Sequence, residues 1–142
     1  MNTKQIGTVA EAKVKANLLA KGFNVAEPEG DYLPFDLVVI TKDLRMYKVQ
    51  VKSGKIKKSG SVNLKLIRNR YEKGRYKHDI RYEEGDVDIF ALYVFDLDSC
   101  FYIKADEIKQ HKYCICFRVN PAKGSQTGRE FRMLKDYENM LL

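Results

Sequence analysis

One apolar run of the sequence begins at an acidic residue, and the next run ends in a Gln-x-Lys pattern. These residue types at this spacing are typical of a reactive site. Asp36 precedes the apolar run 37–40, and Gln50 and Lys52 end the following run. Strands that otherwise look buried rarely carry such polar groups. Alternation puts Gln50 and Lys52 on one face, and the short link 41–45 lets the two strands pair as an antiparallel hairpin. An aspartate, a second oxygen ligand and a lysine meeting on a sheet are suited to metal-assisted phosphodiester hydrolysis.

That chemistry needs a metal to polarise the phosphoryl group, an activated water and stabilisation of the charge that develops. Mg²⁺ prefers oxygen ligands, so we expect Asp36 to be the central ligand, with a main-chain oxygen from Val51. Mn²⁺ can take the place of Mg²⁺. Gln50 is expected to bind metal or water, and Lys52 to orient or help deprotonate the water and stabilise the pentacovalent phosphate. Glu11, at the edge of the apolar stripe of an N-terminal helix, is expected to complete the acidic cluster.

The segments around these residues resemble the PD-(D/E)XK nuclease superfamily. The resemblance rests on residues 7–13, 30–39 and 49–54, and the strand at 86–93 looks like a later core strand of the group. Within the superfamily, the closest likeness is to the small group I intron homing endonucleases of cyanobacteria. The resemblance implies an α/β (α+β) restriction-endonuclease-like core with a mixed central sheet flanked by helices. It also implies site roles for Glu11, Asp36, Gln50 and Lys52.

One departure from the family pattern concerns Gln50, which stands where an acidic residue is usual. The neutral amide removes one negative charge and can weaken the binding of a second metal. A second departure is that no crossover helix follows the lysine strand, because residues 68–85 show no helical period. We expect an extended or irregular arm there.

Each proposed site residue also has a purely structural interpretation. Asp36 and Lys52 can form an ion pair at a sheet edge, Glu11 can pair with Lys15 on the helix surface, and Gln50 can be a hydrogen-bonded core residue. Competing carboxylate pairs stand at strand ends and turns, where aspartate is common anyway: Asp86 with Asp88, and Asp96 with Asp98. His78 and His111 lack metal-site partners and are expected on the surface. The three cysteines are expected to be small buried hydrophobic residues.

The chain is strongly basic, with 26 Lys and Arg against 19 Asp and Glu and a formal net charge of +7. The excess is concentrated between residues 48 and 81, where tyrosines and glycines interleave with the charges. This pattern predicts contact with a polyanion. The residues expected to bind DNA are Lys55, Lys57, Lys58, Lys65, Arg68, Arg70, Arg75, Lys77 and Arg81.

At 142 residues, with 44% hydrophobic residues, the chain fits a single nuclease domain, 1–142, that carries a basic loop and arm at about 53–86. Its apolar runs are much shorter than the roughly 20 residues of a membrane helix, and its first residues lack the pattern of a secretory signal. We expect a cytoplasmic protein without membrane contact.

Hydrophobic periodicity predicts the remaining elements. Helices are expected at 3–19 and 105–110, and strands at 23–26, 61–67, 89–95, 100–103 and 114–119. A capping box at 127–130 predicts a final helix with Phe131, Leu134, Tyr137 and Leu141 facing inward.

The leading hypothesis is a Mg²⁺-dependent, site-specific endonuclease that cuts double-stranded DNA. The alternatives are a Holliday-junction resolvase and a non-catalytic basic nucleic-acid-binding domain. Because one site per chain cuts one strand, a double-strand break requires a homo-oligomer, either a dimer or a dimer of dimers. Expected interface surfaces are the hairpin 95–101 and the final helix with Met133, Met140 and Leu142.

Overall fold

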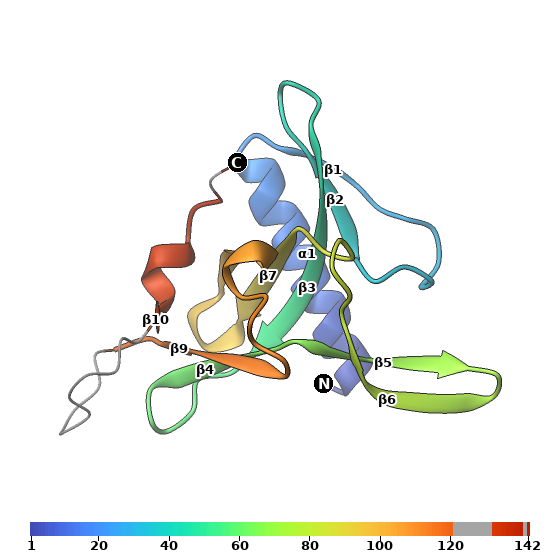
Figure 1. Cartoon of the computed structure of the whole chain (residues 1–142). Coiled ribbons are helices and arrows are strands. Elements are labelled where there is room, and N and C mark those ends of the chain that lie inside the picture. Colours follow the sequence, from blue (N-terminus) through green and yellow to red (C-terminus); the bar gives the residue numbers. More distant parts are fainter. Residues whose placement is uncertain (121–131, 141) are drawn as a thin grey trace.

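A mixed central sheet organises the molecule (Figure 1). The computed structural model describes residues 1–120, 132–140 and 142, and only the backbone at 69–72 and 76–79. In the described chain the sheet order is β1-β2-β3-β7-β8, with β3 and β7 parallel and the other neighbours antiparallel. The bounds are β1 Asn24–Ala26, β2 Leu37–Ile40, β3 Met46–Gly54, β7 Ile89–Val94 and β8 Ser99–Lys104. The predicted hairpin of β2 and β3 and the mixed sheet are confirmed.

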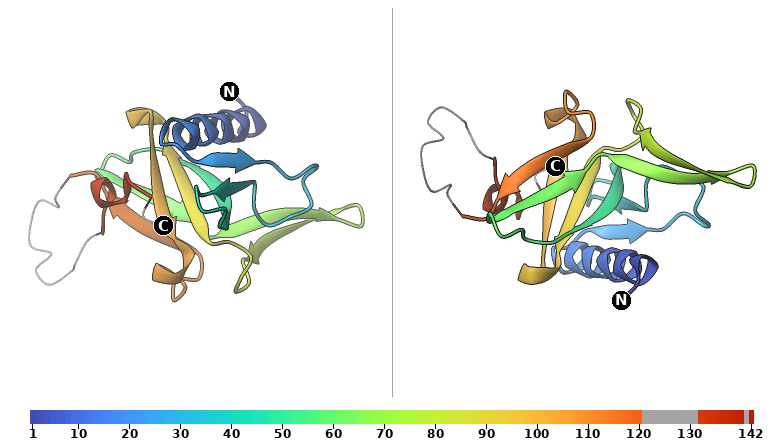
Figure 2. Two further views of the ribbon diagram at one scale, coloured as in Figure 1. Left: turned by 90° about the horizontal axis from the view of Figure 1, so that it is seen from above. Right: turned by 90° about the horizontal axis from the view of Figure 1, so that it is seen from below.

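Helix α1 (Thr3–Ala20) covers one face of this sheet (Figure 2). Asn2 and Gln5 close its first turn with a reciprocal capping box. Ala10, Val14 and Leu18 follow at intervals of four residues and are fully buried, packing with Leu37 and other apolar residues of the sheet. The helices in the described part of the chain lack the length and apolarity needed to span a membrane.

Strands, rather than a further helix, cover the opposite face. A second sheet has the order β10-β9-β4, with β4 Ser61–Lys65, β9 Cys114–Arg118 and β10 Arg132–Met133. Val62 and Phe117 from this sheet meet Phe90 and Leu92 of β7 in a separate apolar cluster. In the described chain α1 flanks one face of the central sheet, and the inward-facing apolar residues of β4 and β9 fill the second core on the other.

The basic arm at 67–81 is a two-stranded antiparallel hairpin of β5 (Ile67–Glu72) and β6 (Arg75–Arg81). It projects beyond the rest of the described chain in the views of Figures 1 and 2. Lys73 and Gly74 turn the hairpin with positive φ angles of 51° and 75°. The connection from β3 to its parallel neighbour β7 thus runs through strands, and it contains no helix, as expected from residues 68–85.

The C-terminal expectations need correction. The capping box at 127–130, Phe131 and Leu141 lie outside the described residues, and the described part holds β10 and a 3₁₀ turn, η3 (Leu134–Tyr137), in place of the final helix. Leu134 is buried, but β10 pairs with β9, so this segment follows the second sheet. Two of the expected interface residues, Met140 and Leu142, are partly buried against the α1-side core rather than exposed.

Shorter elements mostly match expectation. A 3₁₀ turn, η1 (Phe95–Leu97), joins β7 to β8, and η2 (Ala105–Glu107) replaces the short helix expected at 105–110. Cys100 is buried as predicted, whereas Cys114 and Cys116 are exposed on β9, so that prediction is wrong for two of the three cysteines. Their strand presents alternate residues outward, which places both cysteines on its solvent face.

Candidate active site

Asp36 lies where β2 separates from β3. Its N–H donates to the carbonyl of Val49 at 2.9 Å, and its carboxylate Oδ2 accepts from the N–H of Val51 at 2.9 Å. The side chain therefore takes the place of the next main-chain carbonyl that β2 would have supplied. In an antiparallel pair, N–H and C=O of one residue point to the same neighbour, so the Val51 carbonyl also faces the edge that β2 has left.

Gln50 contacts the main chain of the same residue, Val51. Its amide Nε2 donates to the carbonyl of Val51 at 3.2 Å. Gln50 is half-buried on the face of β3 opposite to α1, as alternation predicted. The side chains of Asp36 and Gln50 thus converge on the main chain of Val51.

Lys52 points from the same face as Gln50. Its ammonium donates to the carbonyl of Ile67 at 2.9 Å and lies 5.1 Å from the ring centroid of Tyr82. Burial lowers the pKa of Lys52 to about 8, an effect that nearby Arg68 reinforces and that Asp36 opposes. At pH 7 such a lysine is unprotonated in about a tenth of molecules, far more often than a lysine in water.

The interpretation of Asp36 and Lys52 as a plain ion pair does not fit these contacts. Among the hydrogen bonds of the described residues, the Lys52 ammonium donates to Ile67 and not to the carboxylate. Burial raises the pKa of Asp36, and the negative charge of Asp31 adds to this, while the Val51 N–H and Lys52 act in the opposite direction. The two groups therefore influence each other through space and keep separate partners.

Glu11 reaches the site from α1, as expected. Although the residue as a whole is exposed, partial burial of its carboxylate, followed by the negative charges of Asp36 and Asp31, raises the pKa of Glu11 to about 7. The alternative pairing with Lys15 is wrong, because Lys15 forms its ion pair with Glu27 at 3.1 Å. Glu11 is therefore near enough to Asp36 and Asp31 to be affected by their negative charges.

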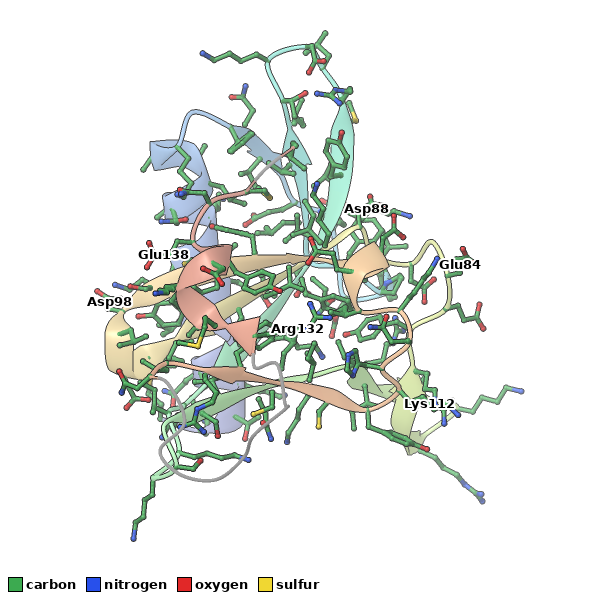
Figure 3. The ribbon with its side chains drawn as sticks, turned by 60° about the vertical axis from the view of Figure 1, so that its left-hand side comes forward. Glu84, Asp88, Asp98, Lys112, Arg132 and Glu138 are labelled. Carbon is green, nitrogen blue, oxygen red and sulfur yellow. The ribbon has the colours of Figure 1, made fainter. Side chains whose placement is uncertain are left out.

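The competing carboxylates are engaged in structural contacts. Asp86 and Asp88 accept main-chain N–H groups of Glu83 and Lys48, and Asp96 accepts that of Ile56. Asp98 accepts the Tyr93 hydroxyl and pairs with Lys13 at 2.9 Å. Figure 3 shows Asp88 and Asp98 well separated in the molecule. These contacts fit turn and strand-end roles, as their positions indicated.

The predicted DNA-binding residues all lie between the end of β3 and the end of the arm, on a segment that we call the basic path. Lys55, Lys57, Lys58, Lys65 and Arg75 are exposed, and Arg68 lies half-buried near Lys52. Arg81, at the base of the arm, donates to the Tyr113 hydroxyl at 2.8 Å and stacks on that ring. Arg70 and Lys77 are paired across the arm in the backbone register, while their side chains lie outside the described part, as does that of His78.

A cleft of about 710 Å³ lies beside this site rather than in it. Its lining includes Leu66, Tyr82, Phe90 and the half-buried His111, and Glu84 and Lys112 on its rim are labelled in Figure 3. None of the four predicted site residues lines it. The candidate site lies instead where β2 and β3 separate.

Two groups near Lys52 were not predicted as part of the site. The carbonyl of Ile67 carries no signal in the sequence, because any residue supplies one. Tyr82 was one of several tyrosines in a basic segment, and no sequence pattern distinguishes it from the others.

The oxygen donors at the β2 and β3 edge fit a hard divalent cation. They are the carboxylate of Asp36, the carbonyl of Val51 and the amide of Gln50. In the described residues no group of three or more His, Cys, Asp or Glu side chains is close enough to hold a metal ion. A cation there would consequently rely on neutral oxygens, water and substrate phosphate as well as on Asp36.

Comparison with known proteins agrees with the fold. A model of the PD-(D/E)XK endonuclease family matches residues 1–140. Among solved structures, the fold is similar to that of a bacterial homing endonuclease, I-Ssp6803I, with a TM-score of 0.73 and 24% identity over 96% of this chain and 88% of that one. No curated protein matches the chain. Because the family model covers nearly its whole length, the chain belongs to the PD-(D/E)XK endonuclease family.

Proposed function

We propose that this endonuclease is a metal-dependent, site-specific enzyme of the homing type that makes double-strand breaks in DNA. The observation that carries the proposal is the convergence of Asp36 and Gln50 on the main chain of Val51, with Lys52 next along the strand. The likeness to a bacterial homing endonuclease supports this reading over other nuclease functions. Because the proposed substrate is DNA, we propose that the enzyme acts inside the cell. We also propose that residues 1–142 act as one nuclease domain.

The divalent cation would be held by Asp36 and the Val51 carbonyl, with Gln50 and Glu11 contributing directly or through water. Mg²⁺ is the expected ion and Mn²⁺ a substitute, since both accept oxygen ligands. When bound, the ion polarises the phosphoryl group and lowers the pKa of water. Because Gln50 is neutral, we expect the first cation to bind more tightly than any second one.

Lys52 has the properties required of a group that acts on water and phosphate. With a pKa of about 8 it exists in both protonation states near neutral pH. The neutral amine can accept a proton from water, and the ammonium can stabilise negative charge on the pentacovalent phosphate. A positioned acid or base of this kind contributes about 10²–10⁴-fold to a rate.

The basic path leading into the β5 and β6 arm would bind the duplex. Its exposed lysines suit phosphate contacts, whereas the arginines of the arm suit bidentate contacts with guanine in the major groove. A two-stranded ribbon fits within that groove. The long arm favours a linear target site over a four-way junction.

Incubation of the purified protein with three DNA substrates tests the proposal. These are total DNA from the source organism, supercoiled plasmid and a synthetic four-way junction, each with Mg²⁺ or with EDTA. We expect Mg²⁺-dependent ends that map to one or a few sites in the total DNA. The D36N variant serves as the matched control for contaminating nucleases.

Other outcomes would select other functions. Symmetric cutting of the junction alone would assign a Holliday-junction resolvase. Binding to all three substrates without Mg²⁺-dependent cleavage would assign a non-catalytic nucleic-acid-binding domain.

A further inference from the structure

Tyr82 contacts the side chain of Lys52 but is not one of the four proposed site residues. The Lys52 ammonium lies 5.1 Å from the centroid of the Tyr82 ring, within the range of a cation–π interaction. Tyr82 directly follows β6, and the other partner of the ammonium, the Ile67 carbonyl, belongs to the first residue of β5. Both groups that hold the lysine therefore come from the base of the arm.

The ring of Tyr82 is itself fixed by the core. It packs edge-on against Phe90, with 5.3 Å between ring centroids and an interplanar angle of 78°. Phe90 is only 4% exposed and stands opposite Gln50 in the β3 and β7 register. Burial, followed by the negative charge of Asp36, raises the pKa of the Tyr82 hydroxyl, so the phenol stays neutral at working pH.

We propose that Tyr82 is a positioning residue that, with the Ile67 carbonyl, orients Lys52 toward the scissile phosphate and joins the base of the arm to the active site. This proposal rests on the proposed function of Lys52. The lysine side chain is a flexible stem of four carbons, and an ammonium without fixed partners would sample many positions. The Ile67 carbonyl fixes the direction of one N–H, and the electron-rich face of the Tyr82 ring attracts the ammonium.

The arm register strengthens the link. Ile67 pairs with Arg81 in the backbone register, and Tyr82 is the next residue. Displacement of the arm base therefore moves both partners of Lys52 together. DNA that seats along the arm acts on the lysine through these two groups.

Replacing Tyr82 by Phe or by Leu distinguishes the effect of the aromatic ring from the effects of the hydroxyl and of apolar volume. Y82F keeps the ring, and we expect its single-turnover cleavage rate to stay within threefold of wild type. Y82L keeps an apolar side chain but loses the π face, and we expect about a tenfold lower rate. The dissociation constant for target DNA should change less than threefold in both, because Tyr82 acts on Lys52 rather than on binding.

Nuclear magnetic resonance reports the contact without any cleavage assay. In protein with ¹³C-labelled lysine, the ring current of Tyr82 should shift the Lys52 Hε signals upfield, with assignment by their loss in K52R. The shift should persist in Y82F and vanish in Y82L. Y113L is the matched control, because it breaks another tyrosine–cation contact, at Arg81, and should leave the Lys52 signals unmoved.

Three results would overturn the positioning role. They are unshifted Lys52 signals in the wild-type protein, equal rate losses in Y82F and Y82L, and a Y82L defect that appears only in DNA affinity. Wild-type protein that shows the shifted signals but cuts no DNA would instead overturn the proposed function, and the ring contact would stand on its own. The wild-type spectrum tests the ring contact by itself, so the proposal can be refuted even if Y82L folds poorly.

Discussion

We expect Asp36 and Lys52 to contribute to chemistry more than to binding, because both are partly buried and lie outside the basic path. We expect D36N and K52A each to reduce DNA cleavage at least about 100-fold, the lower end of the contribution of a positioned acid or base. Affinity for DNA should stay within a few fold of wild type. Single-turnover cleavage and fluorescence anisotropy measure the two quantities separately.

Lys13 and Asp98 offer matched controls for these substitutions. They form an exposed ion pair on α1 and the β7 to β8 turn, and D98N and K13A make the same chemical changes there. Both variants should cut DNA normally. More than a few percent of wild-type cleavage in D36N or K52A would refute the site assignment.

The carboxylate of Glu11 makes the stability of the protein depend on pH. Its pKa is about 7 in the folded protein against 4.5 ordinarily, so the folded state holds the proton more tightly than the unfolded state. The stability that this provides is complete below pH 4.5 and is lost as the pH rises through 7. E11Q removes the titration, and its Tm relative to wild type should therefore increase between pH 5 and pH 8.

The Tm increase should be about 2 °C, because solvent around the exposed Glu11 weakens the effect. Differential scanning fluorimetry in EDTA measures it without interference from divalent cations. K15Q, which breaks the neighbouring ion pair with Glu27, is the comparison variant. A Tm difference that is the same at both pH values would contradict the raised pKa of Glu11.

Much of the candidate site could be predicted at this scale. Strand alternation alone placed Gln50 and Lys52 on one face, and a charged residue at the start of a buried strand identified Asp36. Tyr82 could not be predicted in the same way. Its importance comes from the packing of residues that are far apart in sequence, and no local pattern encodes the 5.1 Å approach to Lys52.

Gly54 ends β3 and lies against Val62 of β4, in the second sheet. A Cβ atom there would lie 2.7 Å from Val62 Cγ1 and 3.2 Å from Leu92 Cδ1, both in the second core. We expect G54A to reduce the free energy of unfolding by about 1–3 kcal/mol through overpacking. Urea denaturation followed by circular dichroism measures the change.

Gly7 provides the opposite case within the same chain. It lies in α1, and a Cβ atom would have nothing within 4 Å. G7A should increase the free energy of unfolding by about 0.5–1 kcal/mol, since alanine loses less backbone entropy in a helix. Changes of the same sign in G7A and G54A would show that crowding does not decide their effects.

The basic loop and the arm should divide the work of DNA binding. Removing Lys55, Lys57 and Lys58 together should weaken binding to every DNA and reduce the salt slope by about 3, because each phosphate contact contributes about 0.9. Substituting Arg68 or Arg75 should instead relax sequence preference by about 1–3 kcal/mol. Titrations with target and random duplexes over a range of salt concentrations distinguish the two effects.

A charge-matched control lies away from the arm. Lys21, Lys42 and Lys135 are exposed at the end of α1, in the β2 to β3 turn and in η3, and their triple replacement should leave the salt slope nearly unchanged. If the loop lysines and arm arginines affected specific and nonspecific affinity equally, the proposed division would be wrong.

Elements with a strong period could be predicted, and those held by distant contacts could not. Helix α1 and the β7 to β8 hairpin were recognisable because their apolar residues follow a regular spacing. The helical spacing of Leu134 and Tyr137 misled. In the structure Leu134 is buried in the second core and Tyr137 packs edge-on against Phe117, so contacts with the β-strands override the local pattern.

At the scale of the whole molecule, one site per chain determines how many copies are needed. A symmetric dimer would place its two sites on opposite strands of a pseudopalindromic target. We expect light scattering to give at least twice the 16.5 kDa of one chain, either free or on DNA, with assembly into a dimer of dimers also compatible. A strict monomer at micromolar concentration that stays monomeric on its target would leave only single-strand nicking.

Strand β7 has a consequence for the fate of the unfolded chain. Its six residues, Ile89–Val94, are all buried and include no charge, proline or glycine, and β3 and β8 pair with both of its edges. Segments of this composition can stack into cross-β fibrils once released. Because a central strand is exposed only by global unfolding, the rate of fibril formation should follow the population of fully unfolded chains, and each kilocalorie lost from either core should increase the tendency of this endonuclease to aggregate.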